Sequence, residues 1–483
     1  MEWHELSHAT QEEQREIQNQ KLRHLMRHEI MFSPYYRTLF AKHEIDPRSI
    51  RTTDDLVKLP FTSKGDLAPT ESDPAKPRQF ILQPDEHLIK KYSSFPRLLK
   101  ILGMKISGTD PKPMLEWEYK PIHMHFTTGR TAFPTPFTYS ARDLETLKES
   151  GKRMLDVIAV PNSIVAINAF PYAPHLAFWL SFFALTAVGM TSMQTGGGKI
   201  TGTQKILDSL ERMKGGLLMG IPGYIYHLLR TAREQKRNLE NIQYVVFGGE
   251  RASPGLREKV KAMLREMGAK DPKIFVTYAF TEGKTAWIQC HETEGYHLYS
   301  DLEYFEVIDK EGKRVPEGQP GELVYTALDW HGSVVLRYRT GDMVQGIEYG
   351  QCPSCGKTTP RILPDIQRTS EIKEFHLTKI KGELINLNQF FPMLSGMPNI
   401  EEWQLEMKKH NDDPHGLDEL ILYVCPKKGY DFAAVKQEVT RKIHNDIMVT
   451  VNVVEKPLSE LLARLGMETE LKEKRIIDNR PKN

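Results

Sequence analysis

The sequence predicts an α/β protein with a large N-terminal α/β lobe and a small α+β C-terminal domain. Apolar runs typical of buried strands occur at 164–167, 245–246 and 275–276, with helical segments between them, and this alternation predicts parallel sheets in the lobe. Past residue 305, glycine turns separate short strands, as in a small β subdomain. After Arg368 the pattern changes again, to a compact module of about a hundred residues.

Individual elements follow from local patterns. Ser140 and Asp143 form a capping box ahead of apolar residues at helical spacing, namely Leu144, Leu147, Met154, Leu155 and Ile158. The C-terminal module is predicted to run helix, strand, strand, helix, strand, at 387–394, 403–407, 419–424, 431–446 and 449–454. We therefore expect two domains, at 1–369 and 370–483.

Composition limits the class of protein. A chain of 483 residues is too long for one growing core, and a net charge of +2 gives no argument for nucleic acid. The longest apolar run, 177–188, is shorter than the ~18 residues of a membrane span, and the polar N-terminus is unlike a secretory signal. We expect a cytoplasmic protein without membrane insertion. Four cysteines indicate no disulfide scaffold, and a homodimer is left open.

Asp342 is the first candidate site residue. It ends the stretch Leu336–Asp342, which is predicted to be a strand end that runs into a glycine turn and presents one carboxylate. Such a carboxylate can accept hydrogen bonds from both hydroxyls of a ribose, so it indicates nucleotide binding. An Asp that bonds its own backbone is the alternative.

A second polar segment lies far upstream. Thr127, Thr128, Gly129, Arg130 and Thr131 combine hydroxyls, a glycine and a cation, as a loop around a polyphosphate requires. The segment is not a Walker A loop, because it has no Gly-Lys-Ser/Thr ending. A Thr-rich turn before a strand is the alternative.

Two further strand ends carry candidate groups. Thr281 and Glu282 follow an apolar-aromatic strand, and Glu282 could hold Mg²⁺, a hard cation that takes oxygen ligands. Gly248, Gly249 and Glu250 follow another buried-strand pattern, where a flat ligand could lie against the backbone.

These elements, in this order, resemble the adenylate-forming superfamily of acyl-CoA synthetases, and most closely its phenylacetate-CoA ligase branch. The family's phosphate loop falls on Thr127–Thr135, its Tyr-Gly-x-Ser/Thr-Glu motif on Tyr278–Glu282, and its Tyr-Arg-Thr-Gly-Asp motif, matched completely, on Tyr338–Asp342. The resemblance implies that the motif residues bind ATP, with Tyr278 and Arg361 among them.

The sequence also departs from the family pattern. Arg130, Ala132 and Ala279 stand where the family has Thr, Gly and Gly, so the loop is expected to be stiffer and to carry an extra cation. Residues 71–118 form a longer segment than the family leads us to expect. We interpret this segment as a subgroup insertion.

Cys352 and Cys355 have the spacing of a zinc knuckle, in which two thiolates on one tight turn take two corners of a tetrahedron. Cys290 and His297 are the candidates for the other corners. This pattern resembles that of the branch, whose members carry Cys and His at matching positions. We expect structural Zn²⁺, because a Cys3His set leaves no open position for catalysis. Reduced thiols, or His291 as the fourth ligand, are the alternatives.

The resemblance also assigns roles to the C-terminal domain. In the family this domain is mobile and rotates about a hinge, which would fall at Arg368–Glu371, and one lysine near the C-terminus stabilises charge on the α-phosphate. That role falls on Lys472, with Lys474 as the alternative. A second alternative is that the lysines of this charged tail are only solvated and have no catalytic role. A free-standing regulatory module fused to an enzyme is the other interpretation of this domain.

Part of an acyl pocket is expected where the branch places it, in the segment 168–179. The candidates are Phe170, Tyr172 and His175, together with Ala279. Aromatic walls fit a flat or cyclic acid, although the same residues could serve only as core packing.

The function implied by the resemblance is that of an ATP-dependent, AMP-forming ligase that joins a small-molecule carboxylic acid to coenzyme A through an acyl-adenylate. Lys472, Glu282 and Arg130 are the expected catalytic residues, with Mg²⁺ on Glu282. Transfer of the acyl or AMP group to another acceptor, and nucleotide binding without catalysis, stay open.

Overall fold

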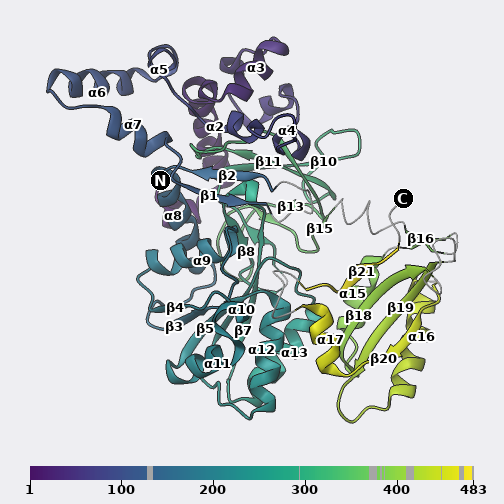
Figure 1. Cartoon of the computed structure of the whole chain (residues 1–483). Helices are drawn as coiled ribbons and strands as arrows, with labels where there is room; N and C mark the ends of the chain where they lie inside the picture. The colour runs from purple at the N-terminus through teal and green to yellow at the C-terminus, as the bar shows by residue number, and fades with distance from the viewer. Residues whose placement is uncertain are drawn as a thin grey trace. The chain divides into compact units, whose positions relative to one another are not determined.

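The computed structural model describes residues 1–127, 134–292, 294–368, 378–380, 383–385, 387–409, 418–447, 449–466 and 473–480. They belong to two compact units, which are described separately. Unit 1 comprises 1–163, 172–192 and 275–366, and unit 2 comprises 164–171, 193–274 and 367–483. Figure 1 shows the helices and strands, with labels where there is room.

The N-terminal part of unit 1 is helical. The longest of its helices, α2 (Gln11–His28), begins at Thr10, whose side chain accepts a hydrogen bond from the Glu13 N–H in a capping box. The other helices of unit 1 are α1 (Trp3–Leu6), α3 (Pro34–Lys42), α4 (Lys64–Leu67), α5 (Glu86–Tyr92), α6 (Phe95–Ile106), α7 (Lys112–Tyr119), α8 (Ala141–Val157) and α9 (Leu176–Ala187). Figure 1 shows α6 apart from the strands of the unit.

The prediction of α8 is confirmed, including its cap. Ser140 accepts a hydrogen bond from the Asp143 N–H, and the apolar face of the helix is buried. Asp143 itself is fully buried and accepts hydrogen bonds from the backbone N–H groups of His331 (2.8 Å) and Gly332 (2.7 Å). The Lys284 ammonium lies 2.9 Å from the same carboxylate, so unit 1 contains a buried ion pair beside the start of α8.

The strands of unit 1 pair in antiparallel fashion. β1 (His123–Phe126) pairs with β2 (Pro136–Tyr139), and β7 (Lys273–Ala279), which belongs to unit 1 from Phe275 onward, pairs with β8 (Ala286–Ile288). One further sheet contains β10 (Glu303–Ile308), β11 (Gly321–Ala327) and β12 (Tyr338–Val344). Another contains β13 (Ile347–Glu348), β14 (Arg361–Ile362) and β9 (Tyr296–His297). These short strands form the small β region that the glycine turns predict.

Unit 2 contains parallel strands, as the sequence predicts. β3 (Val165–Asn168), β5 (Gly215–Gly220) and β6 (Tyr244–Phe247) pair in parallel in that order. The neighbouring elements are β4 (Ser192–Gln194), α10 (Gly198–Thr201), α11 (Thr203–Arg212), α12 (Pro222–Glu234) and α13 (Pro254–Glu266). The predicted α/β class is therefore confirmed.

The C-terminal part of unit 2 is an α+β module. Its sheet has the order β20 (Asn452–Glu455), β19 (Asp418–Pro426), β18 (Ile400–Lys409), β21 (Ile476–Asp478). The remaining elements are β15 (Gln367–Arg368), β16 (Thr378–Ile380), β17 (Glu383–Ile385), α15 (Phe390–Ser395), α16 (Phe432–Ile447) and α17 (Leu458–Leu465). The predicted helices and strands of this module are confirmed, although β20 begins later than predicted and α17 and β21 were not predicted.

Charged groups join this module to α12 and α13 within unit 2. Glu402 of β18 is buried between Arg475, with which it forms an ion pair, and Arg230 of α12, 3.9 Å away. The Lys259 ammonium of α13 donates to the carbonyl of Ile400 at 2.8 Å. Buried charges are stable only when they are paired in this way, so these contacts specify how the module packs on the two helices.

Among the residues that the structure describes, no helix is both long enough and apolar enough to cross a membrane.

Candidate active site

Two motif carboxylates are each held by a tyrosine of the other motif. The Tyr278 hydroxyl donates to Asp342 Oδ2 at 2.7 Å, and the Tyr338 hydroxyl donates to Glu282 Oε1 at 2.7 Å. Asp342 is buried, whereas Glu282, in the one-turn helix after β7, is half-buried. The structure therefore brings the Tyr278–Glu282 and Tyr338–Asp342 segments together in unit 1.

The prediction that a strand ends at Asp342 is wrong. β12 continues to Val344, and its register against β11 shifts opposite Leu323. Gly341 has a φ of +73° at this irregularity, a conformation that residues with a Cβ rarely adopt. The Thr340 hydroxyl fixes the bulge, because it donates to the Leu323 carbonyl (2.8 Å) and accepts from the Asp342 N–H (3.0 Å). A bulge inside the strand, not a turn after it, positions Asp342.

The two ends of the predicted phosphate loop are held together. The Thr127 N–H donates to the Thr135 carbonyl (3.0 Å), and the Thr135 N–H donates to Thr127 Oγ1 (3.1 Å). The predicted residues between them, Thr128, Gly129, Arg130, Thr131 and Ala132, lie outside the described residues.

The start of this loop is also joined to the predicted acyl segment. The Phe126 N–H donates to the Pro174 carbonyl (2.8 Å), and His175 Nδ1 donates to the Phe126 carbonyl (2.9 Å). Tyr172 is exposed, and its ring packs edge-on against that of Phe178, with the two centroids 5.3 Å apart. Tyr172 and His175 both lie in unit 1, and His175 contacts the residue that precedes the loop. Phe170 is buried in unit 2, and Ala279 is exposed at the end of β7.

A pair of histidines on β1 was not predicted. His123 Nε2 lies 2.9 Å from His125 Nε2, and the His123 ring packs against Trp179, with the centroids 5.1 Å apart. Burial, together with the neighbouring His123, His175 and Lys284, lowers the pKa of His125 to about 3, so this imidazole is neutral. Two histidines at i and i+2 share one face of a strand, and this spacing was the available signal.

Three predicted nucleotide residues follow β6 in unit 2. The buried Gly248 donates its N–H to the Gly220 carbonyl at 3.2 Å. Gly249 has a φ of +81°, and Glu250 Oε1 accepts the N–H of Glu473 at 3.2 Å. Lys472 lies outside the described residues, but the residue that follows it contacts a predicted nucleotide residue.

Arg361 is buried on β14 and is occupied by contacts within unit 1. Its guanidinium donates to the Gly350 carbonyl (3.0 Å) and pairs with Glu348 (2.8 Å). A role in nucleotide binding therefore stays a prediction for this residue.

The structure brings the four predicted zinc ligands into one cluster. The ligand atoms of Cys290, His297, Cys352 and Cys355 all lie within 4.8 Å of one another. Cys290 Sγ is 3.4 Å from Cys352 Sγ, and Cys355 Sγ is 3.5 Å from His297 Nε2. A tetrahedral zinc with bonds of about 2.3 Å to sulfur would separate two sulfurs by about 3.8 Å, so the donor set fits the metal.

Neighbouring groups orient these ligands. His297 Nδ1 is 2.9 Å from Thr359 Oγ1, so Nε2 faces the cysteines. Hydrogen bonds from Cys290 and His297 lower the pKa of Cys355 to about 3 despite its burial, and the bond to Cys355 raises that of Cys290. His291, the competing ligand, is not in the cluster.

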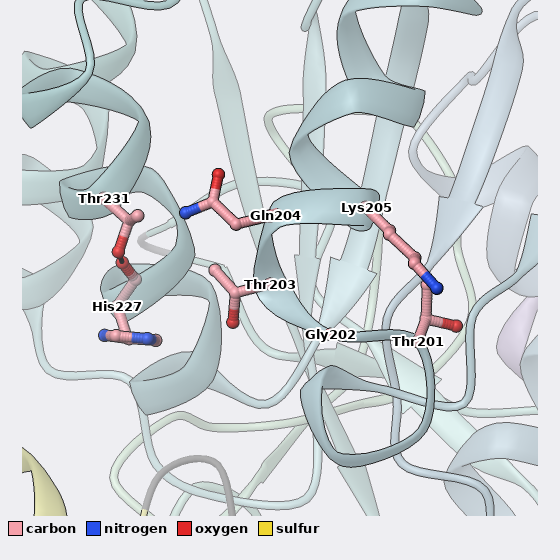
Figure 2. A pocket seen from close by; sticks show the side chains of 7 residues that line it. All are labelled: Thr201, Gly202, Thr203, Gln204, Lys205, His227 and Thr231. Carbon is pink, nitrogen blue, oxygen red and sulfur yellow. Dashed lines mark hydrogen bonds between the residues drawn. The ribbon is translucent and has the colours of Figure 1, made fainter.

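A separate cavity of about 390 Å³ opens beside the start of α11 in unit 2. Figure 2 shows its lining: Thr201, Gly202, Thr203, Gln204 and Lys205 from the α10–α11 segment, with His227 and Thr231 from α12. The Thr231 hydroxyl donates to the His227 carbonyl (3.0 Å), as within a helix. The predicted site residues do not line this cavity.

The chain shares its fold with solved structures of a CoA ligase. Structures of 2-hydroxyisobutyryl-CoA ligase in the postadenylation state, in complex with R3-HIB-AMP and with 2-HIB-AMP, match with TM-scores of 0.77 and 0.76 at 21% and 22% identity, over 99% of this chain and 92% of each neighbour.

The sequence of residues 40–327 matches the AMP-binding enzyme family, and the chain belongs to that family. It is similar to phenylacetate-coenzyme A ligase of Thermus thermophilus, with 24% identity over 93% of this chain and 94% of the relative. The corresponding ligase of Aromatoleum evansii is 23% identical over 98% and 96% of the two chains. The resemblance to the phenylacetate-CoA ligase branch is thus confirmed.

Proposed function

We propose that this protein is an ATP-dependent, AMP-forming carboxylate–CoA ligase that acts through an acyl-adenylate. The observation that carries the proposal is the mutual support of the two motifs, in which Tyr278 holds Asp342 and Tyr338 holds Glu282. This arrangement provides one buried carboxylate for a ribose and one half-buried carboxylate for a cation, in a chain that belongs to the AMP-binding enzyme family.

In the first step, an oxygen of the substrate carboxylate bonds to the α-phosphorus of ATP, and the bond to pyrophosphate breaks. Asp342 would hold the ribose hydroxyls, and the loop from Thr127 to Thr135 would surround the phosphates. Arg130 and Lys472 would stabilise the negative charge that grows on the α-phosphate, since fixed cations act most strongly where charge develops. In the second step, the thiol of coenzyme A loses its proton to solvent and its sulfur bonds to the acyl carbon, while the bond from that carbon to the phosphate oxygen breaks and AMP leaves.

Glu282 is the residue that would hold Mg²⁺. Its carboxylate offers oxygen ligands of the kind that this ion prefers, and Tyr338 engages Oε1 and so orients the group. When bound, the ion would neutralise phosphate charge.

The substrate class that we propose is an aromatic or cyclic acid. The supporting observation is the aromatic cluster around the predicted acyl segment, which includes Tyr172, Phe178, Trp179 and His123. His125, which contacts His123 of this cluster, is neutral and therefore adds no charge that would bind a second carboxylate.

We also propose domains at 1–369 and 370–483, a hinge at Arg368–Glu371 and a cytoplasmic location.

Pyrophosphate release tests the proposed activity. The protein should release pyrophosphate from ATP only when one of a panel of carboxylic acids is present, and addition of coenzyme A should then give a thioester. Release without a thioester would assign another acceptor, and no release with any acid would contradict the enzymatic proposal.

Asp342→Asn should weaken ATP binding by about 1.5–3 kcal/mol, because it removes a charged hydrogen-bond acceptor from the ribose contact. Titration calorimetry with ATP measures this loss, and an unchanged melting temperature shows that the fold is intact. Tyr278→Phe keeps the Asp342 charge and removes the hydroxyl that orients it, so a smaller loss of about 1 kcal/mol is expected. Unchanged affinity in Asp342→Asn would exclude the ribose contact.

We also propose that the cysteine–histidine cluster holds structural Zn²⁺. Cys352→Ser should abolish the zinc that copurifies with the wild-type chain and should lower the melting temperature, because a closed structural site contributes to folding. Elemental analysis of protein purified without added metal measures the first effect. Cys425→Ser, which alters the cysteine outside the cluster, should change neither quantity. Wild-type protein without zinc would show that the cluster consists of reduced thiols.

A further inference from the structure

Helix α6 carries an exposed apolar stripe. Phe95, Leu99, Leu102 and Ile106 are 71%, 51%, 53% and 79% exposed. At about 100° per residue, these four positions fall within an arc of about 60° around the helix axis. Single exposed apolar residues are common, but a continuous stripe over three turns marks a surface that contacts something else.

The opposite side of α6 is fixed to the rest of unit 1. Arg97 donates to the Tyr119 hydroxyl at 2.6 Å, forms an ion pair with Glu118 and lies 3.6 Å from the buried Glu29. The inner apolar residues are half-buried, namely Leu98, Ile101 and Met104. These contacts anchor the helix, so the outward direction of the stripe is a property of the folded unit.

The charge of α6 indicates what the stripe contacts. The helix contains Arg97, Lys100 and Lys105 and no acidic residue, and residues 86–120 carry seven Lys or Arg against four Asp or Glu. Lys100 and Lys105 flank the stripe on its two sides, about 130° and about 90° from its centre. A helix that lies in a bilayer interface has this arrangement, because its apolar face enters the acyl region while flanking lysines reach the phosphates.

We propose that α6 docks this protein peripherally on a bilayer surface that contains anionic lipid. A helix of 12 residues is too short to span a bilayer, so the contact lies in the interfacial plane. Self-association through the stripe is disfavoured, because two facing copies of α6 would bring four lysines together, Lys100 and Lys105 of each copy, without an acidic residue on either helix. The proposal does not depend on the ligase activity, since binding is measured without substrates.

Vesicle flotation of the full chain tests this docking. The wild type should float with vesicles of phosphatidylcholine and phosphatidylglycerol, more weakly with phosphatidylcholine alone, and less as salt is raised. Leu99→Glu/Leu102→Glu should lower the partition coefficient at least about tenfold, because two apolar contacts are lost. Lys100→Gln/Lys105→Gln should remove most of the preference for phosphatidylglycerol.

The matched control is Val57→Glu, which puts a carboxylate on another exposed apolar residue of unit 1 and should leave flotation unchanged. Melting temperatures should be equal in all variants, because every altered side chain is exposed. Equal flotation of the wild type and Leu99→Glu/Leu102→Glu would overturn the proposal. A wild type that fails to float would also overturn the proposal. If sedimentation of that protein then shows a dimer that Leu99→Glu/Leu102→Glu abolishes, the stripe binds a second copy of the chain instead.

Discussion

Asp143→Ala should lower the free energy of unfolding by about 3–5 kcal/mol, the range for breaking a buried ion pair by removing one partner. The substitution leaves the Lys284 ammonium buried beside the rings of Tyr139 and Trp330 without its carboxylate. It also removes the acceptor for the N–H groups of His331 and Gly332. Urea denaturation followed by tryptophan fluorescence measures the loss, since Trp330 is buried next to this site.

A double-variant cycle separates the ion pair from general damage. In Lys284→Met, the Asp143 carboxylate keeps its backbone donors, so the loss should be smaller than in Asp143→Ala. The combined variant should lose less than the sum of the single losses, by at least about 1 kcal/mol, because the second change removes the charge that the first leaves unpaired. Additive losses would contradict the coupling.

The effect of Asp143→Ala should also depend on pH. Burial alone would raise the pKa of Asp143, but the Lys284 charge and the His331 N–H outweigh it, so the pKa lies below its ordinary value. A carboxyl with a lowered pKa in the folded state contributes stability above its unfolded pKa of about 3.9, and this contribution is lost as the pH falls through the folded value. The difference between wild type and variant should therefore shrink at acidic pH.

Strands were predictable where side chains alone mark them. β6 and β7 are apolar runs bounded by glycine or polar residues, and both were predicted. β5 was not, because its sequence, Gly-Gly-Leu-Leu-Met-Gly, is half glycine, and glycine weakens every strand signal. The structure gives one reason for the glycine at its end: a Cβ at Gly220 would lie 2.8 Å from Ile225 Cδ1. That reason depends on how α12, which contains Ile225, packs against β5, and the local sequence pattern of β5 does not contain this information.

The site shows the same division. Sequence motifs singled out Glu282 and Asp342, and the spacing of Cys352 and Cys355 singled out half of the proposed zinc site, because each of these signals lies within a few consecutive residues. Cys290 and His297 lie far upstream of that pair, and only the resemblance to the branch favoured them. The hydrogen bonds from Tyr278 to Asp342 and from Tyr338 to Glu282 could not be predicted, since they depend on how two distant strands meet. The wrong prediction of a strand end at Asp342 has a related cause: glycine in a strand and glycine in a turn look alike until the partner strand is known.

The tail lysine is the other residue for which we expect a large effect. The residues that follow Lys472 are anchored in unit 2: the Glu473 N–H donates to Glu250, the Lys474 N–H donates to the Leu465 carbonyl, and Arg475 is paired with Glu402. These contacts fix the backbone just after Lys472 beside a predicted nucleotide residue. We expect a substitution of Lys472 to act on the chemistry, and an unchanged melting temperature checks that the packing of the module is intact.

Lys472→Ala should cost about 3–4 kcal/mol in adenylate formation, the scale for removing one preorganised contact to a developing charge. Acid-dependent exchange of pyrophosphate into ATP should be nearly lost, while conversion of a supplied acyl-adenylate and coenzyme A to thioester should continue at the wild-type rate. Lys474→Ala is the matched control, one strand step along the tail, and should keep both activities. Selective loss of exchange in Lys474→Ala would move the role to that lysine. Equal impairment of both steps in Lys472→Ala would contradict a lysine that serves adenylation alone, and with it the proposal that the C-terminal domain rotates between the two steps.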